Sequence, residues 1–209
     1  MTQEEFIKVL KKKKYSYKIK GDKIVVTDKE WDVDLEKLKT LPPGVEFNND
    51  GDVNLESLKS LPPGVKFRNK GRVILDSLTS LPPDVEFRNE GSVYLNGLTS
   101  LPPGVELNNE DAVYLRSLTS LPPGMEFRNK GRVHLDDLTS LPSGVMFNNE
   151  SDVELYSLTS IHPGVEFNNG GIVNLRSLTG GWFDYWEGNI DGIGSKRLLN
   201  LMINKGMFI

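Results

Sequence analysis

The chain has 209 residues, no cysteine and a formal net charge of −4, which excludes a disulfide framework and a thiolate metal site. No apolar run approaches the ~20 residues that cross a bilayer, and the basic stripe of a protein that coats DNA is missing. We therefore expect a cytoplasmic protein (in the host cytoplasm if the source is viral) with no cofactor and no membrane contact, and we do not expect nucleic acid as its main partner.

Residues 1–20 form a predicted N-terminal helix and strand cap that is basic, with seven lysines and two glutamates. Thr2 followed by Glu5 is a capping box that predicts a short helix. The apolar face of this helix consists of Phe6, Val9 and Leu10. The stretch YSYKIKGDKIVV predicts a hairpin that turns at Gly21-Asp22. The four consecutive lysines suit a solvated helix end, with binding of nucleic acid or anionic lipid as the alternative.

Residues 21–180 consist of one 20-residue unit repeated in tandem. A degenerate unit covers 21–40, and seven clear units follow it without a gap. The clear units begin at Leu41, Leu61, Leu81, Leu101, Leu121, Leu141 and Ile161. Such repetition indicates a solenoid, because a single unit cannot bury its own apolar face and must stack on its neighbours.

Each unit contains two short stretches of alternating apolar residues, such as 65–67 (VKF) and 73–75 (VIL). This spacing predicts two strands joined by a turn at Asn69-Lys70-Gly71, and no helical stripe is present. The Pro-Pro pair removes two backbone donors and predicts an extended, polyproline-like edge rather than a ladder. Strands of neighbouring units are expected to pair in parallel, about 4.8 Å apart.

One asparagine recurs at the same place in every clear unit: Asn49, Asn69, Asn89, Asn109, Asn129, Asn149 and Asn169. We expect these amides to form a ladder in which each bonds to the next, or to act as simple turn formers. Either role is structural.

The segment LTSLPPGV resembles the short bacterial leucine-rich repeats whose units carry L-T-x-L-P. The full unit is similar to tandem repeats of uncharacterised bacteriophage and bacterial proteins. It departs from the leucine-rich pattern because the asparagine does not follow the strand by three residues and a second V-x-L strand is added. We therefore expect an all-β fold, a right-handed parallel β-solenoid (a leucine-rich-repeat-like β-helix) rather than a horseshoe. It should have two or three sides, about eight 20-residue coils and short helical caps at both ends. The resemblance implies no established activity.

Residues 181–209 form a predicted aromatic loop and C-terminal helical cap. The aromatic group is expected to cover the last coil and comprises Trp182, Phe183, Tyr185 and Trp186. Ser195 is the expected N-cap of a helix that stops before Gly206. The triplet Gly192-Ile193-Gly194 resembles the turn of a helix-hairpin-helix element, so contact with DNA is an alternative to plain capping.

Comparison of the units with one another shows where the sequence varies. The outward position of the first strand is glutamate in five of the seven clear units, whereas that of the second strand reads N, I, Y, Y, H, E, N. Stacking should place four of these variable side chains next to one another. Because exposed tyrosines are enriched at interface hot spots, we interpret them as a recognition patch, with neutral drift as the alternative. The candidate partner-binding residues are Ile74, Tyr94, Tyr114, His134, Arg116 and Tyr156.

No P-loop, zinc-protease or serine-hydrolase motif is present. We therefore expect a non-enzymatic scaffold for protein–protein interaction that presents a variable sheet. A homodimer is one possible oligomeric state. The phage-like resemblance favours one form of this function, an inhibitor of a host defence protein. One alternative is nucleic-acid binding through the caps, or DNA mimicry by an acidic rod. Another is a glycan-acting enzyme, whose carboxylates would come from Asp76, Asp136 and Asp137.

Overall fold

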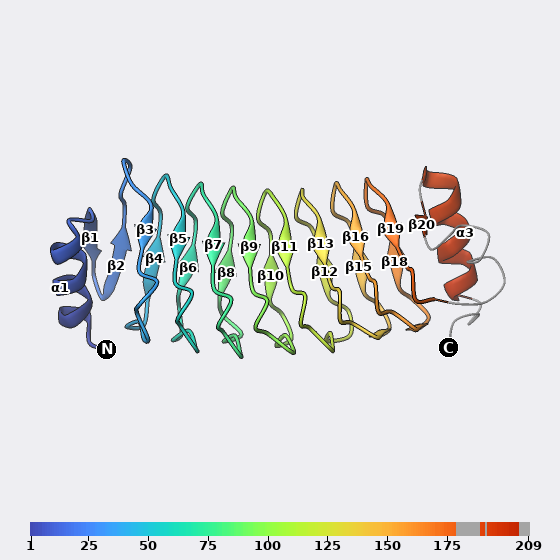
Figure 1. The fold of residues 1–209 in the computed structure, drawn as a ribbon, viewed down its shortest axis with the longest axis horizontal. Coiled ribbons are helices and arrows are strands. Elements are labelled where there is room, and N and C mark those ends of the chain that lie inside the picture. Colours follow the sequence, from blue (N-terminus) through green and yellow to red (C-terminus); the bar gives the residue numbers. More distant parts are fainter. Residues whose placement is uncertain (179–188, 191, 205–209) are drawn as a thin grey trace.

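The computed structural model describes residues 1–178, 189–190 and 192–204. Within these ranges the chain is a parallel β-solenoid of about eight turns with a helix at each end, in agreement with the sequence (Figure 1). None of the helices in these ranges is long and apolar enough to cross a membrane.

The N-terminal cap folds as predicted. Helix α1 (Gln3–Lys13) begins at Thr2, whose hydroxyl accepts from the Glu5 N–H, while the Glu5 carboxylate accepts from the Thr2 N–H at 2.8 Å. Phe6 and Leu10 are fully buried against the first coil. Strand β1 (Tyr17–Lys20) pairs antiparallel with β2 (Lys23–Val26), and Gly21 turns the hairpin at φ +62°.

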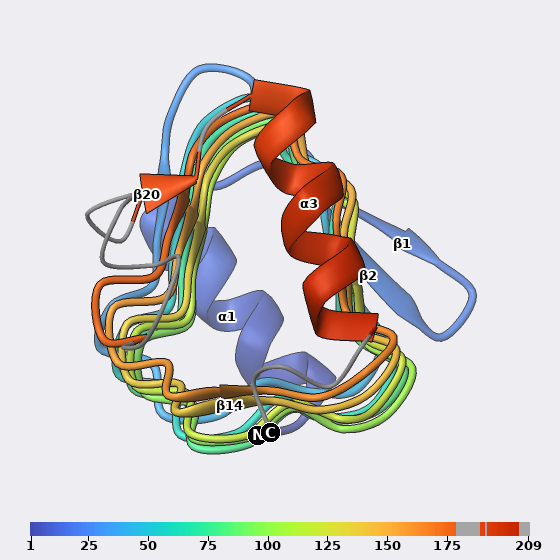
Figure 2. The same ribbon diagram turned by 90° about the vertical axis from the view of Figure 1, so that its right-hand side faces the viewer.

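The coil has three sides, seen end-on in Figure 2. The first-strand sheet continues from β2 through β4 (Val45–Phe47), β6 (Lys66–Phe67), β8 (Glu86–Phe87) and β10 (Glu106–Leu107), and a separate group contains β12 (Glu126–Phe127), β15 (Met146–Phe147) and β18 (Glu166–Phe167).

The second-strand sheet is continuous along the whole solenoid. It consists of β3 (Val33–Asp34), β5 (Val53–Asn54), β7 (Val73–Ile74), β9 (Val93–Tyr94), β11 (Val113–Tyr114), β13 (Val133–His134), β16 (Val153–Glu154) and β19 (Val173–Asn174). Each strand pairs in parallel with its neighbour in a register of 20 residues.

The third side is only partly paired, as the proline pairs predict. Strand β14 (Ser140–Leu141) pairs with β17 (Ser160–Ile161), and single bridges join Ser60 to Ser80 and Ser100 to Ser120.

The core is a set of columns in which the same residue type recurs at each turn. Phe47, Phe67 and Phe87 stack with ring centroids 5.3 and 5.2 Å apart. A second stack joins Phe127, Phe147 and Phe167 at 5.1 and 5.0 Å. Leu107 stands between the two stacks, so the phenylalanine column is interrupted once.

The recurring asparagine does not form the amide ladder that was one of its two expected roles. The Asn69 Nδ2 group donates to the carbonyls of Gly71 (2.9 Å) and Gly51 (3.1 Å), one in its own turn and one in the preceding turn. Among the described residues the Oδ1 atoms of all seven asparagines are buried without a hydrogen-bond partner, so no amide bonds to the next. The amide links successive turns through backbone carbonyls, because these are the acceptors that a tight turn leaves unpaired.

Within the described chain the first-strand sheet is divided at one place, between β10 and β12. Two departures from the repeat meet there, because Leu107 replaces the recurring phenylalanine on one side and Met125 replaces the recurring valine on the other. A change of side-chain size in the core disturbs packing, although the Leu–Phe contact alone does not prevent pairing, since Phe87 and Leu107 pair in β8 and β10. A cleft of about 340 Å³ opens at this division.

The C-terminal cap differs in detail from the prediction. Helix α3 (Gly192–Asn204) begins three residues before Ser195, so Ser195 lies in its first turn and is not its N-cap. Gly192-Ile193-Gly194 belongs to this helix and is not a separate turn ahead of it, so the hairpin resemblance is not maintained. The predicted aromatic lid (Trp182, Phe183, Tyr185 and Trp186) and Gly206 lie outside the described residues.

The last coil is covered by polar side chains spaced four residues apart on α3. Asn200 Oδ1 accepts from the Phe167 N–H (3.0 Å), and Asn204 Oδ1 accepts from the Gly164 N–H (3.1 Å). Lys196 Nζ donates to the Asn169 carbonyl at 2.7 Å. Strand β20 (Asn189–Ile190) pairs antiparallel with β19. The helix thus supplies the hydrogen bonds that a further coil would have made, which blunts an exposed edge.

Candidate functional site

The second-strand face carries the predicted recognition patch. Ile74, Tyr94, Tyr114 and His134 occupy successive places in the register of β7, β9, β11 and β13. Each alternates with fully buried valine and leucine neighbours, so its side chain lies on the outer face. We call these four residues the variable column. They are half-buried, because each covers part of the next.

The rings of the variable column stack face to face. The centroids of Tyr94 and Tyr114 are 4.5 Å apart with 8° between the ring planes, and those of Tyr114 and His134 are 4.5 Å apart with 10°. Because the faces of Tyr114 are covered on both sides, the column offers ring edges and hydroxyl groups to solvent rather than open ring faces. Burial and the neighbouring Tyr94 raise the pKa of the Tyr114 hydroxyl, which therefore stays protonated.

Arg116 and Asp136 lie beside the column. The Arg116 guanidinium is 5.1 Å from the centroid of the Tyr114 ring, and its Nε is 3.7 Å from Asp136 Oδ2. His134 Nδ1 is 4.0 Å from Asp136 Oδ1. Burial lowers the pKa of His134, although Asp136 opposes the shift, and burial raises the pKa of Asp136. The imidazole is accordingly neutral at pH 7.

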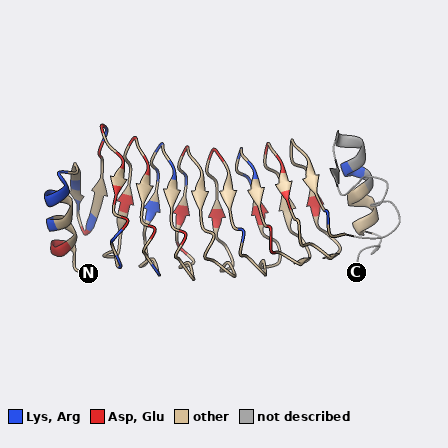
Figure 3. Ribbon diagram, viewed as in Figure 1, with Lys and Arg blue, Asp and Glu red and all other residues tan. Residues whose placement is uncertain are grey.

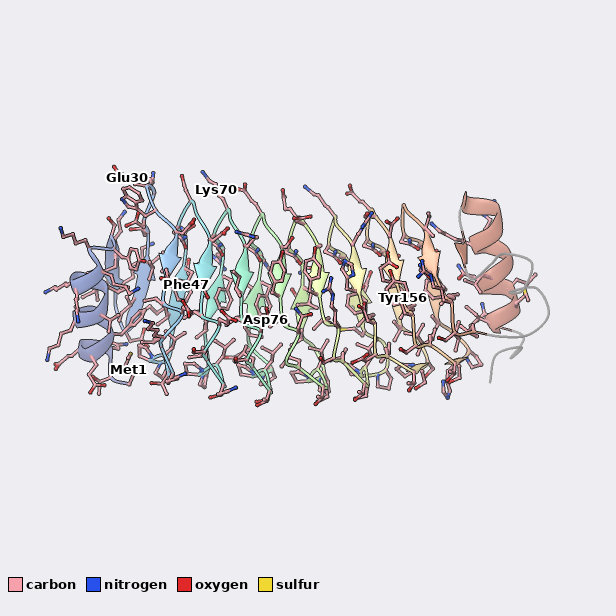
Figure 4. The ribbon with its side chains drawn as sticks, in the orientation of Figure 1. Met1, Glu30, Phe47, Lys70, Asp76 and Tyr156 are labelled. Carbon is pink, nitrogen blue, oxygen red and sulfur yellow. The ribbon has the colours of Figure 1, made fainter. Side chains whose placement is uncertain are left out.

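Tyr156, the last predicted site residue, is labelled in Figure 4. It occupies the position equivalent to Arg116 two units later and is not part of the ring stack. The Arg176 guanidinium is 5.1 Å from its ring centroid. A hydrogen bond to Glu154 raises the pKa of the Tyr156 hydroxyl. Glu154 Oε2 and Asp136 Oδ1 are buried oxygens without a hydrogen-bond partner among the described residues.

Ion pairs fix the margin of the patch on the side of the asparagine turn. Arg72 Nε and Nη2 donate to Asp52 Oδ2 at 2.9 and 2.7 Å, and Arg132 Nε lies 3.0 Å from Asp152 Oδ2. Hydrogen bonding to Asp52 raises the pKa of Arg72. These pairs join successive turns and hold the margin in one geometry.

The first-strand face is different in character. Most of its strands carry an acidic residue (red in Figure 3), and four of its outward glutamates lie within ion-pair distance of basic side chains. Glu86 is 2.6 Å from Lys66 Nζ, 3.1 Å from Arg68 Nη2 and 2.8 Å from Arg88 Nε. Burial would raise the pKa of Glu86, but Lys66 and Arg68 outweigh it and lower the pKa. This face is a self-paired charge network rather than an open acidic strip.

The described residues hold no cluster of three His, Asp or Glu side chains that could bind a metal ion. The variable column itself contains a single imidazole and two phenol hydroxyl groups, which donate and accept hydrogen bonds. Its chemistry is that of hydrogen bonding and aromatic contact.

Sequence reasoning missed two features. One is the division of the first-strand sheet. The sequence signal for it is the pair Leu107 and Met125, the sole departures from phenylalanine and valine at these two core positions in the clear units. The other is Trp31, a side chain that is 68% exposed on the loop between β2 and β3. That loop lies in the degenerate unit, where comparison with the other units gives no guidance.

Comparison of the chain with protein-family models, with curated proteins and with solved structures finds no match.

Proposed function

We propose that the chain is a non-enzymatic binding protein that presents its second-strand face to a protein partner. The observation that carries this proposal is the variable column. The outward positions that differ between units are those that assemble a continuous stacked surface, whereas those of the first-strand sheet are nearly constant.

The surface suits recognition because its parts are rigid before binding. Tyrosines provide large contact area with few rotatable bonds, and stacking restricts the two rings further. Partner binding would then order few side chains. Arg116, Asp136 and Glu154 supply charge of both signs beside the rings, which favours a partner with complementary polar groups around an apolar or aromatic centre.

The structure gives less support to a glycan-acting enzyme and to a protein that mimics DNA. A glycan platform needs open ring faces, and the faces of Tyr114 are covered by its neighbours. Mimicry of DNA needs a regular row of unpaired negative charges, and Glu86 is paired with three cations.

The similarity of the repeat to those of bacteriophage proteins suggests a specific form of this function. We propose an inhibitor that acts in the cytoplasm of a host cell by occupying a defence protein. This finer proposal depends on the resemblance, and the identity of the partner tests it.

The decisive experiment compares partner capture by the wild type and by Tyr94→Ala/Tyr114→Ala, followed by affinity measurement with the purified partner. Loss of the two rings should weaken binding at least thirtyfold, the effect of removing a central anchor of about 2 kcal/mol. Arg116→Glu, at an exposed position, should also weaken binding and leaves the core unchanged.

The matched control is Glu106→Ala/Glu166→Ala, two exposed positions on the first-strand face. This control should bind as the wild type does. If the glutamate pair lowers affinity and the tyrosine pair does not, the recognition surface lies on the other sheet and the proposal fails.

A further inference from the structure

The turn between β2 and β3 lacks the asparagine that recurs at the equivalent turn of the seven clear units. Asp28 occupies the place of the asparagine, because the Asp50 N–H donates to the Asp28 carbonyl (2.9 Å) as the Lys70 N–H donates to that of Asn49 (3.0 Å). An asparagine amide donates hydrogen bonds, whereas a carboxylate only accepts them. The loop must therefore present N–H groups to Asp28 instead of carbonyls.

Asp28 holds the loop in a defined conformation. It is 3% exposed, and its Oδ1 accepts from the N–H groups of Glu30 and Trp31, both at 3.1 Å. Its Oδ2 accepts from the Ser16 N–H at 3.0 Å. Burial would raise the pKa of Asp28, but these N–H groups outweigh it and lower the pKa, so the carboxylate is ionised.

The loop is also one residue longer than the others. Val26 pairs with Phe47 at a spacing of 21, whereas Val33 pairs with Val53 at 20. The extra length carries the loop outward at the edge where Figure 4 labels Glu30. Trp31 is 68% exposed there and is the most exposed large apolar side chain of the described residues.

Trp31 forms one wall of a hollow of about 490 Å³. The hollow is lined by Lys13, Lys14, Tyr15, Trp31 and Asp32. Its side chains are partly fixed, because the Tyr15 hydroxyl accepts from the Asp34 N–H at 2.8 Å and Lys13 Nζ donates to the Asp34 carbonyl at 2.5 Å. The hollow combines two aromatic side chains, two lysines and the Asp32 carboxylate, and Lys13 Nζ also lies 3.7 Å from Asp34 Oδ2.

We propose that this hollow binds one unit of a single-stranded nucleic acid, with a base stacked on Trp31 and the phosphates against Lys13 and Lys14. Exposed aromatic faces beside a positive surface are the elements that bind single strands without sequence preference. Residues 1–20 supply the wider field, with seven lysines and two glutamates. This site is at the N-terminal end and is independent of the variable column.

An acidic protein segment would match the lysines but would not need an open indole ring. The Trp31 N–H donates to Asp28 Oδ1 and fixes the backbone there, while the side chain is 68% exposed and leaves the indole open to a flat base. The structure therefore favours nucleic acid, and an acidic peptide serves as the competing probe.

The test measures binding of fluorescently labelled oligo(dT) of 12 nucleotides by anisotropy in about 50 mM salt. The wild type should bind, with affinity falling as salt rises. Trp31→Ala should weaken binding by about 5- to 100-fold, the loss of one stacked base, and Trp31→Phe should restore part of it. Lys13→Gln/Lys14→Asn should reduce the salt slope by up to about 1.4, because each phosphate contact contributes about 0.7.

The matched control is Lys70→Gln/Lys130→Gln. It removes the same amount of charge from two other turns of the solenoid, neither of which contains Trp31, and it should bind as the wild type does. The melting temperature of Trp31→Ala should equal that of the wild type, because the side chain is exposed. The proposal is overturned if Trp31→Ala binds the oligonucleotide normally. It is also overturned if a polyglutamate peptide of equal charge binds as tightly, which would assign the site to an acidic protein.

Discussion

From Asn69 to Asn169, each asparagine of the repeated turn joins two coils through one NH₂ group. Asn69 Nδ2 also lies 3.3 Å from the Arg72 carbonyl, so three backbone acceptors surround it. The residue is fully buried, and no water competes for these contacts. Asp28 shows the converse, since a carboxylate at the same place requires a loop of different length and polarity.

Replacing Asn69 by Asp should therefore lower the free energy of unfolding by about 2–4 kcal/mol at pH 7, because a nearly isosteric carboxylate would face carbonyl oxygens. Chemical denaturation measures the change. The same substitution at exposed Asn168 should cost less than about 0.5 kcal/mol. Equal stability of the Asn69 variant and the wild type would show that the amide contacts do not stabilise the turn.

His134 should make stability depend on pH in a defined direction. Its neighbours are Asp136, Glu154, Arg116 and Arg132, and burial lowers its pKa below 6.5. The unfolded chain therefore binds a proton that the folded chain does not, so stability falls as pH drops through the window below 6.5. Asp136 acts oppositely, because its raised pKa adds stability as pH falls toward 3.8.

The measurement is the unfolding free energy of the wild type and of His134→Tyr between pH 7.5 and 5. The wild type should lose stability across this range, and the variant should lose less. A parallel decline in both proteins would mean that His134 carries no part of the pH dependence.

At the scale of elements, the division between β10 and β12 coincides with a local change in the core. The two sheet segments on either side contain phenylalanine stacks, and the division lies where Leu107 interrupts them. On the other two sides these turns remain joined, by the bridge from Ser100 to Ser120 and by the pairing of β11 with β13, so only the first-strand side is divided.

Restoring the consensus should close the division. Leu107→Phe/Met125→Val should join the two phenylalanine stacks and slow hydrogen exchange at the amides of residues 126–130, by tenfold or more if one ladder forms. Amides 86–90, already paired, serve as the internal reference. Unchanged exchange at 126–130 would mean that the core residues do not cause the division.

The sequence was sufficient to predict the strands, because Val-x-Phe and Val-x-Leu recur at a fixed period and only stacking buries them. It also predicted the column of Ile74, Tyr94, Tyr114 and His134, which follows from alternation and register. It could not decide between the two roles of the asparagine, since both use the same residue type. It misplaced the start of α3, because Ser195 resembles a cap when the hydrogen bonds before it are unknown. Trp31 escaped notice because its exposure depends on Asp28, a contact that no spacing reveals.

For the whole molecule, the period of 20 residues makes each turn nearly independent. Stability in such arrays is approximately a sum over turns and their interfaces. Deleting residues 81–100 should give a folded, shorter solenoid with a lower melting temperature, because Leu101 would follow Ser80 in the same register.

Deleting residues 81–95 is the control, since removal of fifteen residues shifts every later strand out of register and should abolish folding. Circular dichroism and size-exclusion chromatography distinguish the two outcomes. If both deletions fold equally well, the stacking register does not determine the fold.

The division of the first-strand sheet gives the molecule a mechanical character. A rod with ladders on all sides resists bending everywhere, but here the resistance is lowest at one junction, and on one side only. Bending there would widen the cleft while β11 and β13 remain paired and Tyr114 remains stacked on His134. The second-strand face could thus change its curvature without interrupting the variable column. A partner that contacts the solenoid on both sides of the division would select the angle between the two parts.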